Sequence, residues 1–204
     1  MTTVVFDSST KTLWADTQST ELDDGTITGY NFNNLKLFRT SHFIAGGSGN
    51  YYAATRMMAH LIGWQLDCKI QEIPNLRGPY NWGDSQFIVA TNEVVALFQC
   101  SAHYPFLWPI TRPYAVWKCI SVWEYGEDLV SNAPNVNYLC IGSGQPAFDE
   151  SIIKTGNVIE AFHFVAELDQ HTGGRLISTS LKGNEMLVDH GPLGYRLVQG
   201  RWII

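Results

Sequence analysis

The sequence predicts an α+β protein in which two β-sheets are enclosed by helices. Runs of alternating or β-branched apolar residues open and close the chain, and segments with helical apolar spacing lie between them. A doubly wound parallel sheet would instead alternate strands and helices along the whole chain. The 204 residues are enough for a large core. We therefore expect a single domain over 1–204.

The first element expected is a β-hairpin that joins TTVVF at residues 2–6 to TLWAD at residues 12–16. The Ser and Asp side chains of the connecting DSSTK can bond the backbone of a turn. A turn centred in that segment makes the positions of antiparallel partners sum to about 19. Asp16 is therefore expected opposite Thr2 or Thr3, with a short distance between the side chains.

Strands are expected next at residues 26–30 and 34–47, and the alternation in the second directs Lys36 away from its two leucine neighbours. The glycine-rich run at 46–50 ends this sheet. A helix is expected over 51–66, because its apolar residues recur at helical spacing. The stripe consists of Ala54, Met57, Met58, Leu61 and Trp64.

Prolines and glycines shape the middle of the chain. Residues 67–86 hold two of each, so a loop is expected there. Two β-rich runs at 85–100, separated by Thr91 and Asn92, predict a hairpin. The aromatic, proline-rich stretch at about 103–126 is interpreted as an insertion. It is either a locally packed subcore or a contact surface, and the subcore is favoured because large aromatic side chains are mostly buried.

The last third predicts a strand, a glycine turn and a short helix over 136–156. A second helix is expected over 157–174, capped by Asn157 and closed by the glycine pair at its end. Final strands are expected at 175–181 and 195–204.

Composition excludes several classes of function. A net charge of −6 without a Lys/Arg run gives no footprint for nucleic acid. No apolar stretch approaches the length of a membrane span, and no signal peptide is evident, so we expect no membrane association and a cytoplasmic location. The four cysteines form no CxxC pair, and no histidine stands at metal-ligand spacing. We expect reduced, structural cysteines and neither a metal nor an organic cofactor.

Two glycine motifs do not match known nucleotide or nucleophile motifs. GGSGN at 46–50 lacks the Lys and Ser/Thr of a P-loop, and GSG at 142–144 lacks the spacing of a GxSxG elbow. Both turns therefore need another explanation.

Thr2 is the residue that points to chemistry. We expect the initiator methionine to be removed, because the small threonine side chain permits that trimming. The free α-amino group then has a pKa of about 7.7 to 8.0 and can take the proton of its own residue's hydroxyl. A Lys36 cation held by Asp16 would favour the neutral amine. A backbone N–H at Gly46 or Gly47 would stabilise an oxyanion.

Several short segments, in order along the chain, resemble one family. After TTVV at 2–5, they are ADTQST at 15–20, LKL at 35–37, FIAGGSGN at 43–50, CIGSGQP at 140–146 and DQHTGG at 169–174. Together they resemble the proteasome β-type subunits of the N-terminal nucleophile hydrolase superfamily, most closely the HslV-like peptidases. That resemblance implies a four-layer αββα sandwich with two antiparallel sheets between helical layers.

The resemblance also implies a catalytic site whose residues come from the whole chain: Thr2, Asp16, Lys36, Gly46, Ser143, Asp169 and Thr172. The first is the nucleophile, the next two are its charged partners, and the glycine N–H donates to the oxyanion. The serine contacts the threonine amine, and the last two residues brace the site. The implied reaction is hydrolysis of a peptide bond through an ester to the threonine, without a cofactor.

The partners implied are a peptide or unfolded protein as substrate, further copies of the chain in a homo-oligomer, and an ATP-dependent unfoldase. Two alternatives stay open at this point. One is a catalytically inactive subunit that keeps the fold for a structural or interaction role, and the other is an amidase acting on small amides.

Overall fold

The computed structural model describes residues 2–23, 26–31, 34–62, 77–79, 83–103, 113–125, 137–183, 185–193, 196–198 and 201–203. Its helices are α1 (Tyr51–Ile62), α2 (Gln145–Thr155) and α3 (Val158–Leu168). Its strands are β1 (Thr3–Asp7), β2 (Thr12–Asp16), β3 (Ser19–Asp23), β4 (Thr26–Asn31), β5 (Leu37–Arg39), β6 (Ile44–Ser48), β7 (Arg77–Pro79), β8 (Gln86–Ala90), β9 (Val94–His103), β10 (Tyr114–Glu124), β11 (Tyr138–Gly142), β12 (Arg175–Ser180), β13 (Val188–Pro192), β14 (Arg196–Val198) and β15 (Arg201–Ile203).

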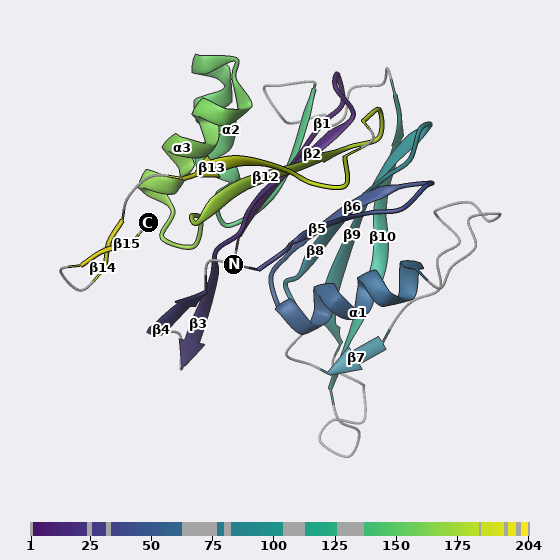
Figure 1. The fold of residues 1–204 in the computed structure, drawn as a ribbon. Helices are drawn as coiled ribbons and strands as arrows, with labels where there is room; N and C mark the ends of the chain where they lie inside the picture. The colour runs from purple at the N-terminus through teal and green to yellow at the C-terminus, as the bar shows by residue number, and fades with distance from the viewer. Residues whose placement is uncertain are drawn as a thin grey trace.

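Two antiparallel sheets form the centre of the molecule. One has five strands in the order β11-β1-β2-β12-β13, and the other has six in the order β5-β6-β8-β9-β10-β7. Figure 1 shows α2 and α3 beside the first sheet and α1 beside the second, with the sheets facing each other between them. The predicted four-layer αββα arrangement is confirmed.

The core consists of three apolar layers that follow this arrangement. Between the sheets lie residues such as Val4, Phe6 and Ile88, all fully buried. A second layer joins the six-stranded sheet to α1, and a third joins the five-stranded sheet to α2 and α3. Since successive side chains of a strand point to opposite faces, β1 contributes Val4 to the middle layer and Val5 to the third. The strand that follows Thr2 is thus held from both sides.

The first hairpin has the expected register. Val4 pairs with Ala15, so partner positions sum as predicted and Asp16 follows opposite Thr3. The Asp7 carboxylate accepts hydrogen bonds from the Ser9 backbone N–H at 2.9 Å and from nearby hydroxyls, which closes the turn.

Several element boundaries differ from the sequence predictions. Leu35 is 57% exposed although Leu37 is buried, because strand β5 begins only at Leu37. The expected apolar stripe of α1 shifts slightly, with Ala53, Met57 and Leu61 buried, and Trp64 lies outside the described residues. Part of the predicted loop at 67–86 is strand β7, which pairs with β10.

The C-terminal predictions are right in kind and wrong in detail. Asn157 caps α3 as expected, its side chain accepting from the Ile159 and Glu160 N–H groups. The helix, however, ends at Leu168 rather than at the glycine pair, because Asp169 is extended and begins a turn of its own. Strand β13 was not predicted, and residues 195–204 contribute two short paired strands, β14 and β15.

Part of the aromatic stretch at about 103–126 is a β-strand. Residues 114–124 form β10, paired with β9 along its length, and Trp117 is buried beneath α1. Residues 104–112 and 126 of the stretch lie outside the described residues. Its interpretation as an insertion stays a prediction.

Candidate active site

Thr2 lies directly before β1, an interior strand of the five-stranded sheet, and is fixed there by its own carbonyl. The Ser143 backbone N–H donates to the Thr2 carbonyl at 3.2 Å. Gly142 has a φ of +101°, and a Cβ atom there would lie 1.6 Å from the same oxygen. The GSG turn at 142–144 therefore needs glycine at its first position so that the chain can approach Thr2 this closely.

The Thr2 side chain lies between a carboxylate and an ammonium group. The Thr2 hydroxyl donates to Asp16 Oδ1, and Lys36 Nζ donates to the Thr2 oxygen. Lys36 Nζ also lies 3.0 Å from Asp16 Oδ2. The structure thus brings the predicted nucleophile and its two predicted charged partners into direct contact.

Backbone donors hold the Asp16 carboxylate in place. It accepts from the N–H groups of Thr3 at 2.9 Å, Gln18 at 3.1 Å and Gly173 at 3.2 Å. The Asp16 side chain is fully buried, so these bonds replace the water it has lost. Its position is therefore set by its own segment and by two others.

Lys36 is also nearly enclosed, with a side chain 9% exposed, and it donates to the Gln18 carbonyl in addition to Asp16. Burial lowers the pKa of Lys36, since desolvation disfavours the charged amine, while the charge of Asp16 and, more weakly, that of Asp169 act in the opposite direction.

A second polar network lies behind the first. Asp169 Oδ2 accepts from the Ser143 and Thr172 hydroxyls, each at 2.7 Å. Because the Thr172 proton goes to Asp169, the Thr3 hydroxyl donates to Thr172 Oγ1 at 2.6 Å. The predicted residues Ser143, Asp169 and Thr172 are thus together. Two contacts connect this network to Thr2. The side chain of the next residue, Thr3, bonds Thr172, and the Ser143 N–H bonds the Thr2 carbonyl.

Gly46 is the predicted site residue that the structure does not bring to this cluster. A Cβ on Gly46 would meet Leu37 and Val4 between the sheets. The Gly47 N–H points to the Lys36 carbonyl at 3.2 Å, so the alternation of a strand directs the Gly46 N–H toward β8, where its partner is Ile88.

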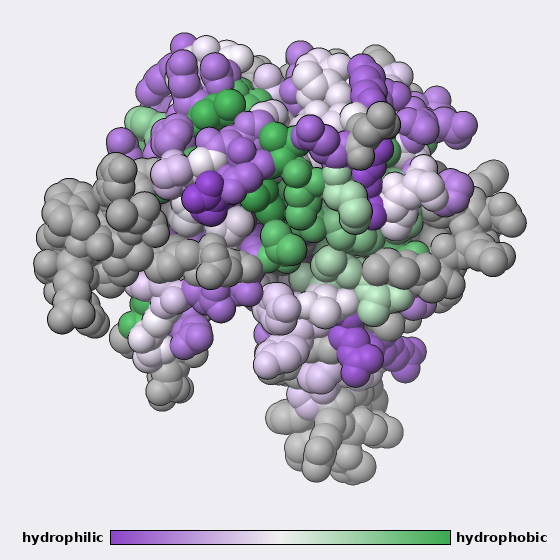
Figure 2. Space-filling view, in the orientation of Figure 1, coloured by the Kyte–Doolittle hydropathy of each residue, from purple (hydrophilic) through white to green (hydrophobic). Residues whose placement is uncertain are grey.

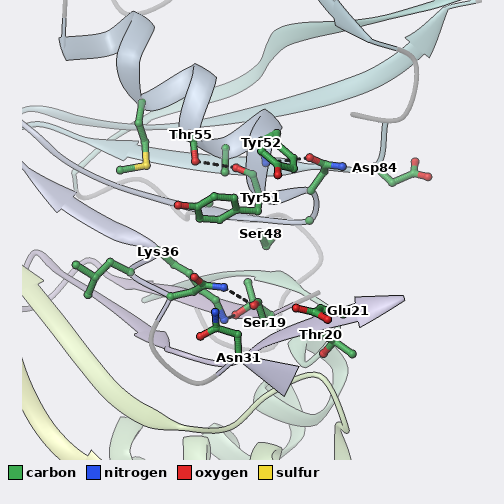
Figure 3. Close-up of a pocket in the computed structure, with 18 of the residues that line it drawn as sticks. Ser19, Thr20, Glu21, Asn31, Lys36, Ser48, Tyr51, Tyr52, Thr55 and Asp84 are labelled. Atoms are coloured by element: carbon green, nitrogen blue, oxygen red, sulfur yellow. Dashed lines mark hydrogen bonds between the residues drawn. The ribbon is translucent and has the colours of Figure 1, made fainter. Parts of the chain in front are cut away.

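A cleft of about 950 Å³ opens at Thr2 and Lys36. One wall comes from β3, β4 and the segment before β5, and the other from α1 and the glycine turn before it; Figure 3 shows Ser19 and Asn31 facing Tyr51 and Ser48 across it. Figure 2 shows the molecule hollowed between β3–β4 and α1. Gly47 is part of this lining, whereas Gly46 is not.

Sequence reasoning missed four contributors to the site. Thr3 joins the two networks, Gln18 supplies a carbonyl and an N–H, Gly173 donates to Asp16, and Gly142 admits the Thr2 carbonyl. The hairpin register already placed Thr3 beside Asp16, so its role was accessible. The contributions of Gln18 and Gly173 come from backbone atoms, which every residue has, so the residue type gives no indication of them.

No group of three or more His, Cys, Asp or Glu residues in the described ranges is arranged to hold a metal ion. Among the same residues no helix is long and apolar enough to cross a membrane.

Comparison with solved structures gives a consistent set of matches. The chain is similar to eukaryotic HslV from Trypanosoma brucei, with a TM-score of 0.51 and 13% identity over 92% of this chain and 99% of that one. It is also similar to Anbu, an ancestral β-subunit, from Yersinia bercovieri, with a TM-score of 0.52 and 12% identity over 94% and 87%. The chain has the N-terminal nucleophile hydrolase fold.

A third match is Thiobacillus denitrificans BPH in complex with epoxomicin, with a TM-score of 0.52 and 12% identity over 89% of this chain and 100% of that one. No protein-family model matches the sequence, and comparison with curated proteins gave no match. At these identities the likeness shows the proteasome-like fold, and function has to be argued from the site.

Proposed function

We propose that this protein is a threonine-type peptidase that hydrolyses amide bonds through an ester to Thr2. One observation carries the proposal: the Thr2 hydroxyl contacts both Asp16 and Lys36 at the floor of a cleft. A threonine that merely precedes a strand has no need of a buried ion pair around its oxygen. Burying such a pair costs free energy that a structural role does not require.

The chemistry depends on removal of Met1. In the full chain the Thr2 nitrogen is the amide that follows Met1. Once it is a free amine, it accepts the proton of the Thr2 hydroxyl while the oxygen bonds to the substrate carbonyl carbon. The Lys36 ammonium stabilises the negative charge that develops on the threonine oxygen, and Asp16 holds Lys36 in position.

The remaining steps balance without a cofactor. The tetrahedral intermediate collapses, the carbon–nitrogen bond breaks, and the leaving amine takes the proton from the Thr2 amine. Water, deprotonated by the same amine, then attacks the ester and releases the acid together with a restored hydroxyl. We propose that the oxyanion donor comes from the backbone of the glycine run at 46–49, which is supported by the place of Gly47 and Gly49 in the lining of the cleft. The Gly47 N–H itself is already bonded to the Lys36 carbonyl.

The proposed substrate is a peptide or an unfolded protein, in keeping with the open cleft and with the fold that the chain shares with HslV. We further propose that the chain works as a homo-oligomer served by an ATP-dependent unfoldase. Sedimentation of the purified protein measures the first of these, and ATP-dependent degradation of an unfolded substrate measures the second.

Intact mass spectrometry before and after an epoxyketone inhibitor tests the proposal. The similar structure of BPH is a complex with epoxomicin, which makes that compound a suitable probe. We expect loss of Met1 and one adduct on the wild type and on Thr155→Ala, which removes an exposed threonine at the end of α2. We expect no adduct on Thr2→Ala. A retained Met1 with no adduct would instead support an inactive subunit with an interaction role.

A further inference from the structure

Two carboxylates line the cleft without a cationic partner among the described residues. Glu21 comes from β3 and Asp84 from the segment before β8, and both side chains are exposed. Figure 3 shows them on opposite walls. Neither makes an ion pair with any residue in the described ranges. Lys36 is the one Lys or Arg of the described lining, and its charge is already matched by Asp16.

The rest of the lining is suited to a polar and positively charged group. Most of its side chains carry hydroxyls or amides: Thr2, Ser19, Thr20, Thr28, Asn31, Asn34, Ser48, Asn50 and Thr55. The lining also includes Tyr51 and Tyr52, which are 54% and 73% exposed and whose ring centroids lie 5.8 Å apart. Exposed tyrosine faces attract cations through the ring quadrupole. Large apolar side chains contribute little beyond Leu35 and Met58.

We propose that the cleft selects peptides with a lysine or arginine among the three residues before the cleaved bond, and that Glu21 and Asp84 determine this specificity. The cleavage part of the inference rests on the proposed peptidase function, whereas the binding preference does not. Both uncompensated charges of the described lining have the same sign, and they lie on opposite walls, so a cation that enters the cleft is attracted from both sides.

The preference should be moderate and sensitive to salt. Both carboxylates are exposed, and exposed ion pairs change affinity by about threefold each, so we expect about a tenfold preference for the two together. Screening at about 1 M salt shortens the Debye length to about 3 Å and should remove most of the preference.

Binding to the Thr2→Ala variant tests the inference without turnover. The probes are fluorescein-labelled peptide amides that are identical except for Arg, Gln or Glu in those three residues, followed by fluorescence anisotropy at low and high salt. The variants are Glu21→Gln, Asp84→Asn and both together. Glu167→Gln, an exposed carboxylate on α3 outside the cleft, is the matched control.

We expect the Arg peptide to bind about tenfold more tightly than the Gln peptide, the double variant to bind both equally, and the control to keep the preference. Equal binding of the Arg and Gln peptides, or a preference that survives in the double variant, overturns the inference. Cleavage by the wild type is measured separately. Selective binding without epoxomicin labelling or cleavage would refute the peptidase function and support the binding preference. Cleavage without selective binding would support the peptidase function and refute the binding preference.

Discussion

Asp16 is the residue on which most of the site depends. Its carboxylate accepts from three backbone N–H groups and pairs with Lys36, so its charge and both its oxygens are used. An amide in its place offers one acceptor and turns two N–H donors toward the donors already present. It also leaves the Lys36 ammonium buried without a counter-charge.

We therefore expect Asp16→Asn to lower the free energy of unfolding by about 3–5 kcal/mol and to abolish labelling of Thr2. Urea denaturation measures the first effect and intact mass the second. Asp189→Asn is the control, because Asp189 pairs with Arg175 where both side chains are about half exposed, and such pairs contribute about 1 kcal/mol or less. Similar losses in the two variants would contradict the structural role given to Asp16.

Lys36 gives a prediction in which activity and stability move in opposite directions with pH. Burial lowers its pKa, so the amine loses its proton below the 10.5 of an ordinary lysine. If the ammonium assists catalysis, kcat/KM falls as pH rises through that lowered pKa. Between the lowered pKa and 10.5 the unfolded chain binds more protons than the folded one, so the Lys36 contribution to stability becomes more favourable as pH rises.

Subtracting the unfolding free energies of Lys36→Met from those of the wild type isolates this contribution, which is needed because burial also raises the pKa of Tyr125. We expect the difference to shift in favour of the wild type as pH approaches 10.5. A difference that is independent of pH would mean that Lys36 titrates alike in the folded and unfolded chains.

Among single residues, those that share a local register were predictable. Thr2 and Asp16 follow from the register of one hairpin, whose side chains alternate with a period of two residues. Lys36 lies just before β5, where the predicted alternation does not hold, and its place in the site came from the family resemblance. The directions of the backbone N–H groups in the glycine run were not predictable in this way. Gly46 and Gly47 look alike in sequence, and only their pairing with β5 and β8 distinguishes the directions of their N–H groups.

Among the elements, the turn between β11 and α2 controls the position of β1. Gly142 combines a positive φ with an approach to the Thr2 carbonyl that leaves no room for a Cβ atom. Gly191, in β13, has a φ of +99°, and a Cβ atom there would have nothing within 4 Å. Substitution of Gly191 therefore measures the cost of backbone strain alone, whereas substitution of Gly142 adds the cost of a steric clash.

We expect Gly191→Ala to cost about 1–2 kcal/mol of unfolding free energy, the usual cost of a strained backbone conformation. Gly142→Ala should cost about 3 kcal/mol or more, since a backbone clash adds to that strain, and it should prevent Thr2 labelling. Chemical denaturation of both variants gives the comparison. If the two costs agree within error, the close approach to Thr2 has no separate energetic effect.

Elements with strong local signals were predicted well, and those stabilised by sheet position were not. The hairpin of β8 and β9 has apolar runs on both sides of a polar turn, and Asn157 is a typical helix cap. Strand β13 contains a glycine and a proline and lies at the edge of its sheet, where pairing with β12 alone is enough. No pattern in its sequence indicates a strand.

At the scale of the whole molecule, the hydrophobic core is divided into separate layers, and the reactivity of two buried thiols measures the opening of two of them. Cys100 belongs to the layer under α1, and Cys140 to the layer under α2 and α3. Burial, assisted by the Asp84 charge, raises the pKa of Cys100 to about 11. Burial also raises the pKa of Cys140 well above that of a free thiol. Thiolates are the reactive form, so both cysteines should resist alkylation until their layer opens.

Substitutions within one layer should therefore accelerate alkylation in that layer alone. Leu61→Ala removes apolar contacts beneath α1, and Phe162→Ala removes them beneath α3, each at a cost of about 2–5 kcal/mol. With iodoacetamide labelling at about pH 8, where free thiols are partly ionised, followed by peptide mapping, we expect Leu61→Ala to expose Cys100 first and Phe162→Ala to expose Cys140 first. Equal acceleration at both thiols would mean that the layers open only together, through global unfolding. Selective opening would show that α1, which forms one wall of the cleft, can loosen while β1 and Thr2 stay in place.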